Sequence, residues 1–230
     1  MTDHIAPLAQ PSPRLIRLVI TLALAGLFSG LLIVGVYEIT LAPITANREA
    51  SLRRAVLEVI PGSTRMQPLV WGGTTLDPVV KPEAGALVIY AGYDDAGVFQ
   101  GYGIPAHGPG FQDDIALIFG YAPAERKIVG LVILESRETP GLGDKIYKDE
   151  AWVTAFRSLA VDPEVVVVKD GAQTANQIDA ITGATISSNA VVKIVNAANG
   201  EWLERMPEPG AEPPLMNTTS EAEAVPEGDE

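Results

Sequence analysis

The segment DAITGAT (179–185) places two threonines around a Gly-Ala pair, directly before a run of residues with helical periodicity. The first N–H groups of a helix are unpaired and favour an anion, and small residues let a phosphate approach the backbone closely. The segment therefore predicts a phosphate site. Ordinary helix capping by Ser187 or a threonine is the alternative. The candidate residues are Asp179, Thr182, Gly183, Ala184 and Thr185.

A second segment, ESRETPGLGDK (135–145), follows a predicted strand and contains a Pro-Gly pair and one further glycine. This composition is typical of a tight loop that exposes backbone donors, and Lys145 adds a cation. Such a loop could line a flat aromatic ligand, and an ordinary connection between a strand and a helix is the alternative. The candidate ligand-binding residues are Glu138, Thr139, Gly141, Leu142, Gly143 and Lys145.

The composition excludes most other reactive sites. The 230 residues include no cysteine and only two histidines, which argues against disulfides, thiolate metal sites, iron–sulfur clusters and catalytic triads. Gly-rich phosphate loops, HExxH and GxSxG are also absent from the sequence. The net charge of −13 argues against nucleic acid as a partner. We expect no metal site, and any redox centre of this chain should be organic.

Residues 18–37 form an apolar run whose only ionisable side chain is Tyr37. At ~1.5 Å per residue, this run spans ~30 Å, the thickness of the hydrocarbon core of a bilayer. It is longer than the apolar region of a signal peptide, and a buried core helix is the other alternative. Residues 1–17 would form a short tail before this transmembrane helix. Arginines flank both ends of the run in nearly equal number, so the short tail is the better argument that the tail lies inside and the following domain outside.

Residues 38–206 are expected to form one domain of mixed α+β class, with an antiparallel sheet flanked by helices. Hydrophobic spacing predicts helices over 47–60, 152–159 and 187–205, a hairpin over 86–104, and strands over 115–121, 128–134 and 165–168. Residues 207–230 contain seven acidic residues, five prolines and no Lys or Arg. They should form a disordered acidic tail.

The two candidate segments together resemble a known family. The pair ETPGLGDK (138–145) and DxxTGAT (179–185), behind one membrane span, is similar to the covalent-FMN subunits of ion-translocating electron-transport complexes. The G subunits of the Rnf complex are the most similar of these, and the resemblance runs from the anchor through Arg205. The C subunits of the Na⁺-translocating NADH:quinone reductase share both motifs, and Asp144-Lys145-Ile146 favours the G subunits.

The resemblance implies a covalent cofactor. In that family the residue matching Thr185 is joined to the FMN phosphate by a phosphoester. A flavin transferase installs the FMN from FAD, and Asp179 would belong to the sequence that the transferase recognises. Thr182 and Gly183 would contact the same phosphate.

The loop 138–145 would hold the isoalloxazine ring, and Lys145 or nearby N–H groups would stabilise the negative charge of the reduced flavin. Tyr102 and Phe111 are aromatic candidates beside the ring, with core packing as the alternative for each.

The implied function is electron carriage through FMN, in a membrane complex that couples electron transfer between ferredoxin and NAD to ion translocation. Other subunits, the flavin transferase and the lipid bilayer would be its partners. The chain would lie in the bacterial inner membrane, with the FMN domain on the periplasmic side. No residue is expected to be catalytic. A membrane-anchored flavin sensor and a structural accessory that packs through Gly26 and Gly30 are the alternatives from other classes.

Overall fold

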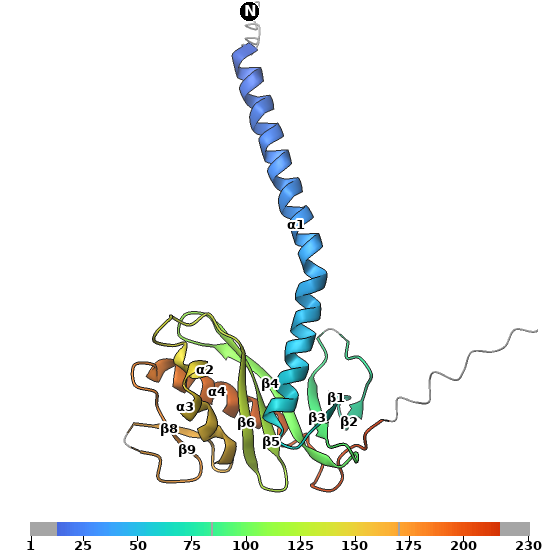
Figure 1. Cartoon of the computed structure of the whole chain (residues 1–230), viewed down its shortest axis with the longest axis vertical. Coiled ribbons are helices and arrows are strands. Elements are labelled where there is room, and N and C mark those ends of the chain that lie inside the picture. The colour runs from blue at the N-terminus through green and yellow to red at the C-terminus, as the bar shows by residue number, and fades with distance from the viewer. Residues whose placement is uncertain (1–12, 84, 170, 217–230) are drawn as a thin grey trace, which may run out of the picture. The chain divides into compact units, whose positions relative to one another are not determined.

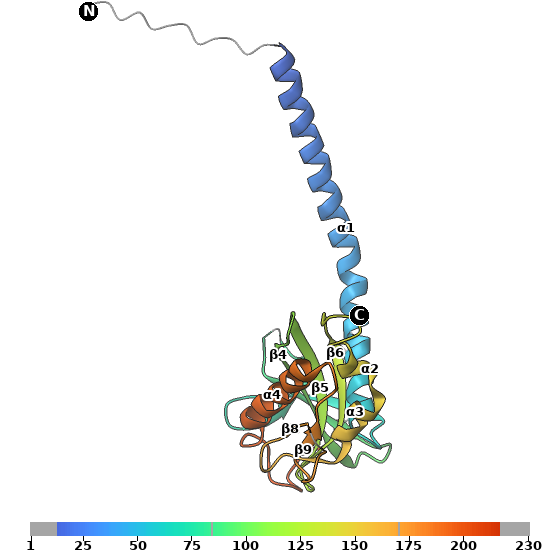
Figure 2. The same ribbon diagram turned by 90° about the vertical axis from the view of Figure 1, so that its left-hand side faces the viewer.

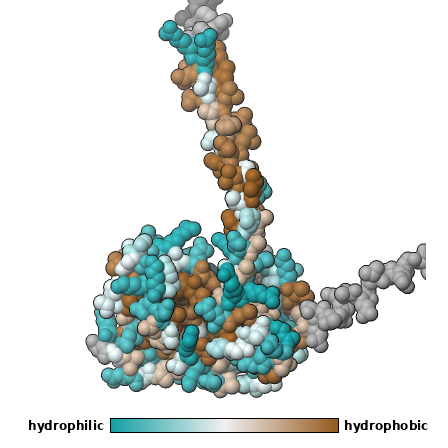
Figure 3. Space-filling model, viewed as in Figure 1, coloured by the Kyte–Doolittle hydropathy of each residue, from teal (hydrophilic) through white to brown (hydrophobic). Residues whose placement is uncertain are grey.

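The computed structural model describes residues 13–83, 85–169 and 171–216, which fall into two compact units that divide after Ala50. The first unit consists of most of helix α1 (Pro13–Val59). This helix is long and apolar enough to cross a membrane, and the most apolar 18 residues have a mean hydropathy of 2.5 and are not buried by the protein. Figure 3 shows the apolar surface along the helix. Such exposure argues against a buried core helix and agrees with a membrane span.

The predicted span and the predicted helix over 47–60 belong to the same continuous helix. The connecting residues remain helical although Pro43 lies inside the helix. A proline inside a helix removes one backbone hydrogen bond, yet the helix continues on both sides of Pro43. The predicted membrane-spanning residues 18–37 are therefore one part of a longer helix.

The second unit is built on a seven-stranded antiparallel sheet with the order β2-β1-β3-β4-β5-β6-β7 (Figure 1). The strands are β1 (Arg65–Trp71), β2 (Leu76–Pro78), β3 (Val88–Tyr93), β4 (Phe99–Pro109), β5 (Asp114–Ala122), β6 (Lys127–Glu135) and β7 (Leu159–Ala160). Two short strands, β8 (Val166–Val168) and β9 (Gln177–Asp179), pair in parallel beside it. The predicted α+β class, the hairpin and the two following strands are confirmed. The strands β1, β2, β7 and β9 were not predicted, because they are short or, in β1, interrupted by Pro68.

Helices cover one face of this sheet. They are α2 (Lys145–Lys148), α3 (Glu150–Ala155), which continues into a 3₁₀ turn at Phe156–Ser158, and α4 (Thr185–Trp202). Figures 1 and 2 show α4 lying across the sheet. The residues that helical spacing turns inward are all buried, namely Val191, Ile194, Val195, Ala198 and Trp202. Their burial fixes the position of the start of α4, where the candidate phosphate site lies.

The end of α1 covers the other face of the sheet within the second unit. Val56, Val59 and Ile60 are buried there, in a cluster with side chains from β3 and β5. Gly120 and Gly130 lie opposite each other on β5 and β6. A Cβ atom at Gly130 would lie 2.6 Å from the carbonyl oxygen of Val59, and one at Gly120 would overlap the same oxygen. The two glycines therefore let the helix end approach the sheet closely.

Residues 207–216, the first part of the predicted acidic tail, contact the sheet. The Tyr93 hydroxyl donates to the Pro213 carbonyl at 2.5 Å, and the Gln67 side chain donates to the Pro214 carbonyl and accepts from the Met216 N–H, at 3.2 and 2.6 Å. Gln67 is buried, so its amide needs partners that a disordered tail would not supply. Residues 217–230 lie outside the described residues.

Candidate functional site

The DAITGAT segment ends at the start of α4, as predicted. Gly183 has a φ of +82°, a left-handed conformation that favours glycine. Ala184 is the N-cap residue, and no side chain caps the helix there. Within the described residues, the alternative in which Thr185 or Ser187 caps α4 is therefore not supported, and Ser187 donates to Glu138 instead. The first N–H groups of a helix have no acceptor within the helix itself, so they suit an external one.

The serines that follow Thr185 support the segment from inside. The hydroxyl of Ser188 accepts from the N–H of Ile181 at 3.2 Å and donates to the carbonyl of Ala184 at 3.0 Å. The side chain of Asn189 donates to the carbonyl of Thr185 at 2.7 Å. Ser188 is fully buried, whereas Thr185 is half-buried. The sequence analysis missed these supports, because a serine early in a helix is most simply explained as a cap.

The ETPGLGDK segment forms a tight loop between β6 and α2. The N–H of Leu142 donates to the carbonyl of Thr139 at 3.2 Å, with Gly141 between them at a φ of +79°. The Thr139 hydroxyl donates to the Gln112 side chain at 2.9 Å, which ties this loop to the loop between β4 and β5. Leu142 is 51% exposed, so the loop presents an apolar side chain to solvent.

Lys145 joins the two predicted segments. Its Nζ donates to the carbonyl of Thr182 at 2.9 Å. A Cβ atom at Gly183 would lie 3.5 Å from that Nζ and 3.7 Å from the Cδ2 of Leu142. The structure thus brings together Lys145, Leu142, Thr182 and Gly183, as a shared site requires.

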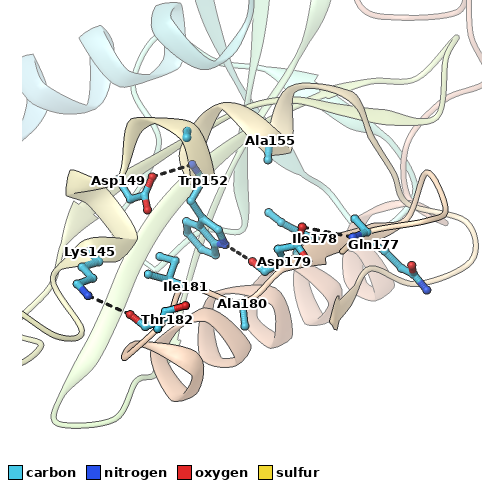
Figure 4. Close-up of a pocket in the computed structure, with 12 residues that line it drawn as sticks. Lys145, Asp149, Trp152, Ala155, Gln177, Ile178, Asp179, Ala180, Ile181 and Thr182 are labelled. Carbon is cyan, nitrogen blue, oxygen red and sulfur yellow. Dashed lines mark hydrogen bonds between the residues drawn. The ribbon is translucent and has the colours of Figure 1, made fainter. Parts of the chain in front are cut away.

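A pocket of about 550 Å³ opens beside these residues, between α3 and the segment around β9 (Figure 4). Lys145 and Thr182 line it from the candidate site, and Trp152 lines it from α3. The Trp152 indole N–H donates to the carbonyl of Asp179 at 2.9 Å, which ties α3 to the start of the DAITGAT segment. The remaining lining residues are Asp149, Ala151, Ala155, Ala172, Gln177, Ile178, Asp179, Ala180 and Ile181. The sequence analysis did not identify this pocket, because its walls come from elements far apart in the sequence.

The side chain of Asp179 holds the chain that precedes β9. Its carboxylate accepts from the N–H groups of Gly171 and Ala172 at 2.9 and 3.3 Å. The Asp179 side chain therefore stabilises a turn. The hydrogen bond from Trp152 goes to the backbone carbonyl of Asp179 and not to its side chain.

Glu138 is buried beneath the loop that contains it. Its carboxylate accepts from the N–H groups of Phe111 and Gln112 at 2.8 and 2.9 Å, and the Ser187 hydroxyl donates to its other oxygen. Burial acts to raise the pKa of Glu138, but the hydrogen bonds from Ser187, Gln112 and Phe111 outweigh it, so the pKa lies below its ordinary value. The structure therefore uses both carboxylate oxygens of Glu138 inside the protein.

The two aromatic candidates lie in different environments. Tyr102 is fully buried, with its ring centroid 4.7 Å from that of Phe99, so core packing is its role. Phe111 is 63% exposed on the loop that donates to Glu138. Among the described residues, no group of three or more His, Asp or Glu side chains is placed to hold a metal ion.

Comparison with known proteins places this site in a family. Residues 110–199, which include both segments, match the FMN-binding domain family. The chain is 29% identical to the G subunit of the ion-translocating oxidoreductase complex of Methanosarcina acetivorans, over 81% of this chain and 94% of that protein. It is 30% identical to the protein of the same name from Haemophilus influenzae, over 75% of this chain and 83% of that protein.

A solved structure, NqrC of Shewanella oneidensis, shares the fold, with a TM-score of 0.53, 18% identity, and coverage of 66% of this chain and 91% of that one. At this identity the likeness concerns the fold alone. The Haemophilus relative decides between the two families that share the motifs, because its identity extends over most of both chains. The chain therefore belongs to the G subunits of ion-translocating oxidoreductase complexes, as a membrane-anchored subunit with an FMN-binding domain.

Proposed function

We propose that the chain carries FMN through a phosphoester to Thr185 and passes electrons within an Rnf-type complex that couples ferredoxin and NAD to ion translocation. One observation supports the site above all others. Thr185 opens α4 behind an uncapped helix start, inside a domain that matches the FMN-binding family. The Thr185 hydroxyl and the first N–H donors of α4 lie at the same helix end, and this combination suits a phosphate.

The residues around Thr185 fit the phosphate end of FMN. Gly183 is exposed and has no side chain, so a phosphate could approach the backbone there. Lys145 supplies a cation beside Gly183, and one of its three protons is used by Thr182. Thr182, Gly183, Ala184 and Thr185 would therefore surround the phosphate, with Lys145 neutralising part of its charge.

The loop after β6 and the neighbouring pocket fit the rest of the cofactor. Thr139, Gly141, Leu142 and Gly143 of the loop would form one side of the ring site, and Lys145, where the loop meets α2, also lines the pocket. When bound, FMN supplies the electron-transfer chemistry. The chain needs to bind the ring, orient it and stabilise its charge, and none of these tasks requires a general base.

Attachment would use Thr185 once, during maturation. A flavin transferase would act on FAD so that a bond forms between the Thr185 oxygen and the phosphorus of the FMN half. The pyrophosphate bond of FAD breaks, AMP leaves, and the hydroxyl proton is released. The mass of the chain then rises by FMN minus water. Asp179 would serve this step by fixing the turn before the segment, because its carboxylate holds the N–H groups of Gly171 and Ala172.

The membrane arrangement completes the proposal. Helix α1 would hold the chain in the bacterial inner membrane, with the FMN domain on the periplasmic side. Other subunits would then carry electrons to and from the FMN, because no described cluster of ligands on this chain would hold a metal centre.

The proposal is tested on the assembled complex. Membranes that contain the complex with Thr185→Ala should lose ferredoxin-dependent NAD reduction, and Thr185→Ser should keep part of it, because serine retains the hydroxyl. Normal electron flow with Thr185→Ala in a fully assembled complex would reject the role of Thr185. Immunoblots of the other subunits control for assembly.

A further inference from the structure

Glu138 is a buried carboxylate that contacts three separate segments. It is 5% exposed. It accepts from Phe111 and Gln112 in the loop between β4 and β5, and from Ser187 in the first turn of α4, while its own backbone belongs to the loop between β6 and α2. These three donors give both oxygens of this acceptor-only group a protein partner.

Two glycines make room for this carboxylate. A Cβ atom at Gly110 would lie 2.5 Å from its Oε1, and one at Gly143 would lie 2.6 Å from its Oε2 and 2.8 Å from the Ser187 hydroxyl. Atoms this close would have to move, so the glycines and the carboxylate fit together only in the observed arrangement. The tight packing comes from the same three segments as the hydrogen bonds.

Ser187 is adjacent to the residues that shape the motif. It lies two residues after Thr185 and next to Ser188, which bonds to Ile181 and Ala184. A contact that holds Ser187 in place therefore also holds the segment 181–185, through the first turn of α4. Through Gln112 and Thr139, the same contacts also reach the loop between β6 and α2.

We propose that Glu138 is a positioning residue, which locks the loops 110–113 and 138–143 onto the first turn of α4 and so holds Thr185 and the ring-binding loop in one geometry before the flavin arrives. This inference rests on the proposed function of Thr185. It differs from the expectation that Glu138 contacts the cofactor, since both of its oxygens are occupied by protein donors.

The first test measures the lock without any flavin. Hydrogen–deuterium exchange is recorded on the full chain with Thr185→Ala, alone and combined with Glu138→Ala, Ser187→Ala or Glu125→Ala. Glu138→Ala and Ser187→Ala should raise exchange together at 110–113, 138–143 and 185–189, on the order of tenfold, because a hydrogen bond to a buried charge is lost. Glu125 is an exposed carboxylate in the turn between β5 and β6, and Glu125→Ala should change none of them. Faster exchange confined to 138–143 would overturn the proposal.

The second test measures the consequence for attachment. The flavin-free chain is incubated with FAD and a purified flavin transferase, and covalent flavin is followed by in-gel fluorescence. Glu138→Ala should lower kcat on the order of tenfold with the KM for FAD unchanged, and Glu138→Gln should recover part of the rate. Tyr93→Phe, which removes the hydrogen bond between β3 and Pro213, is the control for general destabilisation. Equal rates for Glu138→Ala and Tyr93→Phe would reject the inference.

The two tests separate this inference from the proposed function. A wild-type chain that gains no flavin would contradict the role of Thr185 and leave the exchange experiment to decide the role of Glu138. A wild-type chain that gains flavin, with Glu138→Ala gaining it equally fast, would contradict the role of Glu138 alone.

Discussion

At the scale of single residues, the charges beside the candidate site are paired in different ways. Lys148 pairs with the buried carboxylate of Asp144 at 2.6 Å, whereas Lys145 donates to a carbonyl of the motif. Only the second arrangement leaves a positive charge beside the proposed cofactor. Removing Lys145 therefore tests electrostatic stabilisation of the reduced flavin without leaving a buried carboxylate unpaired.

Lys145→Met should lower the flavin midpoint potential. A cation near a partly exposed ring favours the reduced, negatively charged form by about 1 kcal/mol, which is on the order of 40 mV for one electron. The potential is measured by redox titration of the flavin absorbance in the purified subunit. Lys127→Met, at the opposite end of β6 from the loop, is the control and should leave the potential within a few millivolts of wild type. Equal shifts for both variants would show that net charge, not the position of Lys145, sets the potential.

Glu138 predicts a pH dependence of stability. Its pKa is lowered in the folded protein by the hydrogen bonds that outweigh burial. A lowered folded pKa means that its stabilisation is fully present above the unfolded pKa, about 4.3, and is lost as the pH falls through the folded pKa. The difference in unfolding free energy between wild type and Glu138→Gln, measured in urea, should shrink from pH 7 towards pH 3. A difference that grows on acidification would contradict this account.

At the scale of elements, close packing of α1 on the sheet depends on glycines. Gly120→Ala should destabilise the domain by about 1–3 kcal/mol, because the new methyl group would meet the backbone of Val59. Gly200→Ala is the same substitution at an exposed helical site with open space around it, and it should stabilise α4 by about 0.5–1 kcal/mol. Thermal unfolding of both variants should give shifts of opposite sign. Shifts of the same sign would reject the packing argument.

The segment 207–216 gives a second prediction at this scale. Removing every residue after Met206 should cost on the order of 3 kcal/mol, because three hydrogen bonds to Gln67 and Tyr93 are lost. A chain that ends at Met216 keeps those bonds and should unfold in urea at the same midpoint as the full chain. If both truncations behave alike, the segment does not contribute to the stability of the domain.

The helix that carries the site could be predicted from the sequence, whereas its contacts with distant segments could not. Helix α4 was predicted well, because its apolar residues repeat with helical spacing and are buried on one face. The position of the DAITGAT segment directly before this helix was also predicted, because the helical periodicity begins just after it. By contrast, the sequence left Ser187 as a possible cap of this helix, whereas its hydroxyl donates to Glu138 in another segment. Contacts between distant segments, such as that of Ser187 with Glu138, leave no local pattern in the sequence.

At the scale of the whole molecule, the uneven composition reflects two parts of the chain, an apolar helix and an acidic folded domain. The apolar residues concentrate in α1, and acidic residues outnumber basic ones in the rest of the chain. The lack of cysteine and the two histidines predicted an organic redox centre, and the match of residues 110–199 to the FMN-binding family agrees with it. The pocket beside Lys145 was beyond sequence reasoning, because its walls meet only in the folded chain.

The covalent bond at Thr185 is the central claim, and intact mass tests it most directly. The full chain and its Thr185→Ala variant are purified from cells that contain a flavin transferase, then analysed by mass spectrometry and, after denaturation, by in-gel fluorescence. We predict that the wild type carries the added mass of FMN minus water and fluoresces in the gel, and that Thr185→Ala does neither. A wild-type chain of unmodified mass, or a Thr185→Ala chain that still carries covalent flavin, would contradict the account.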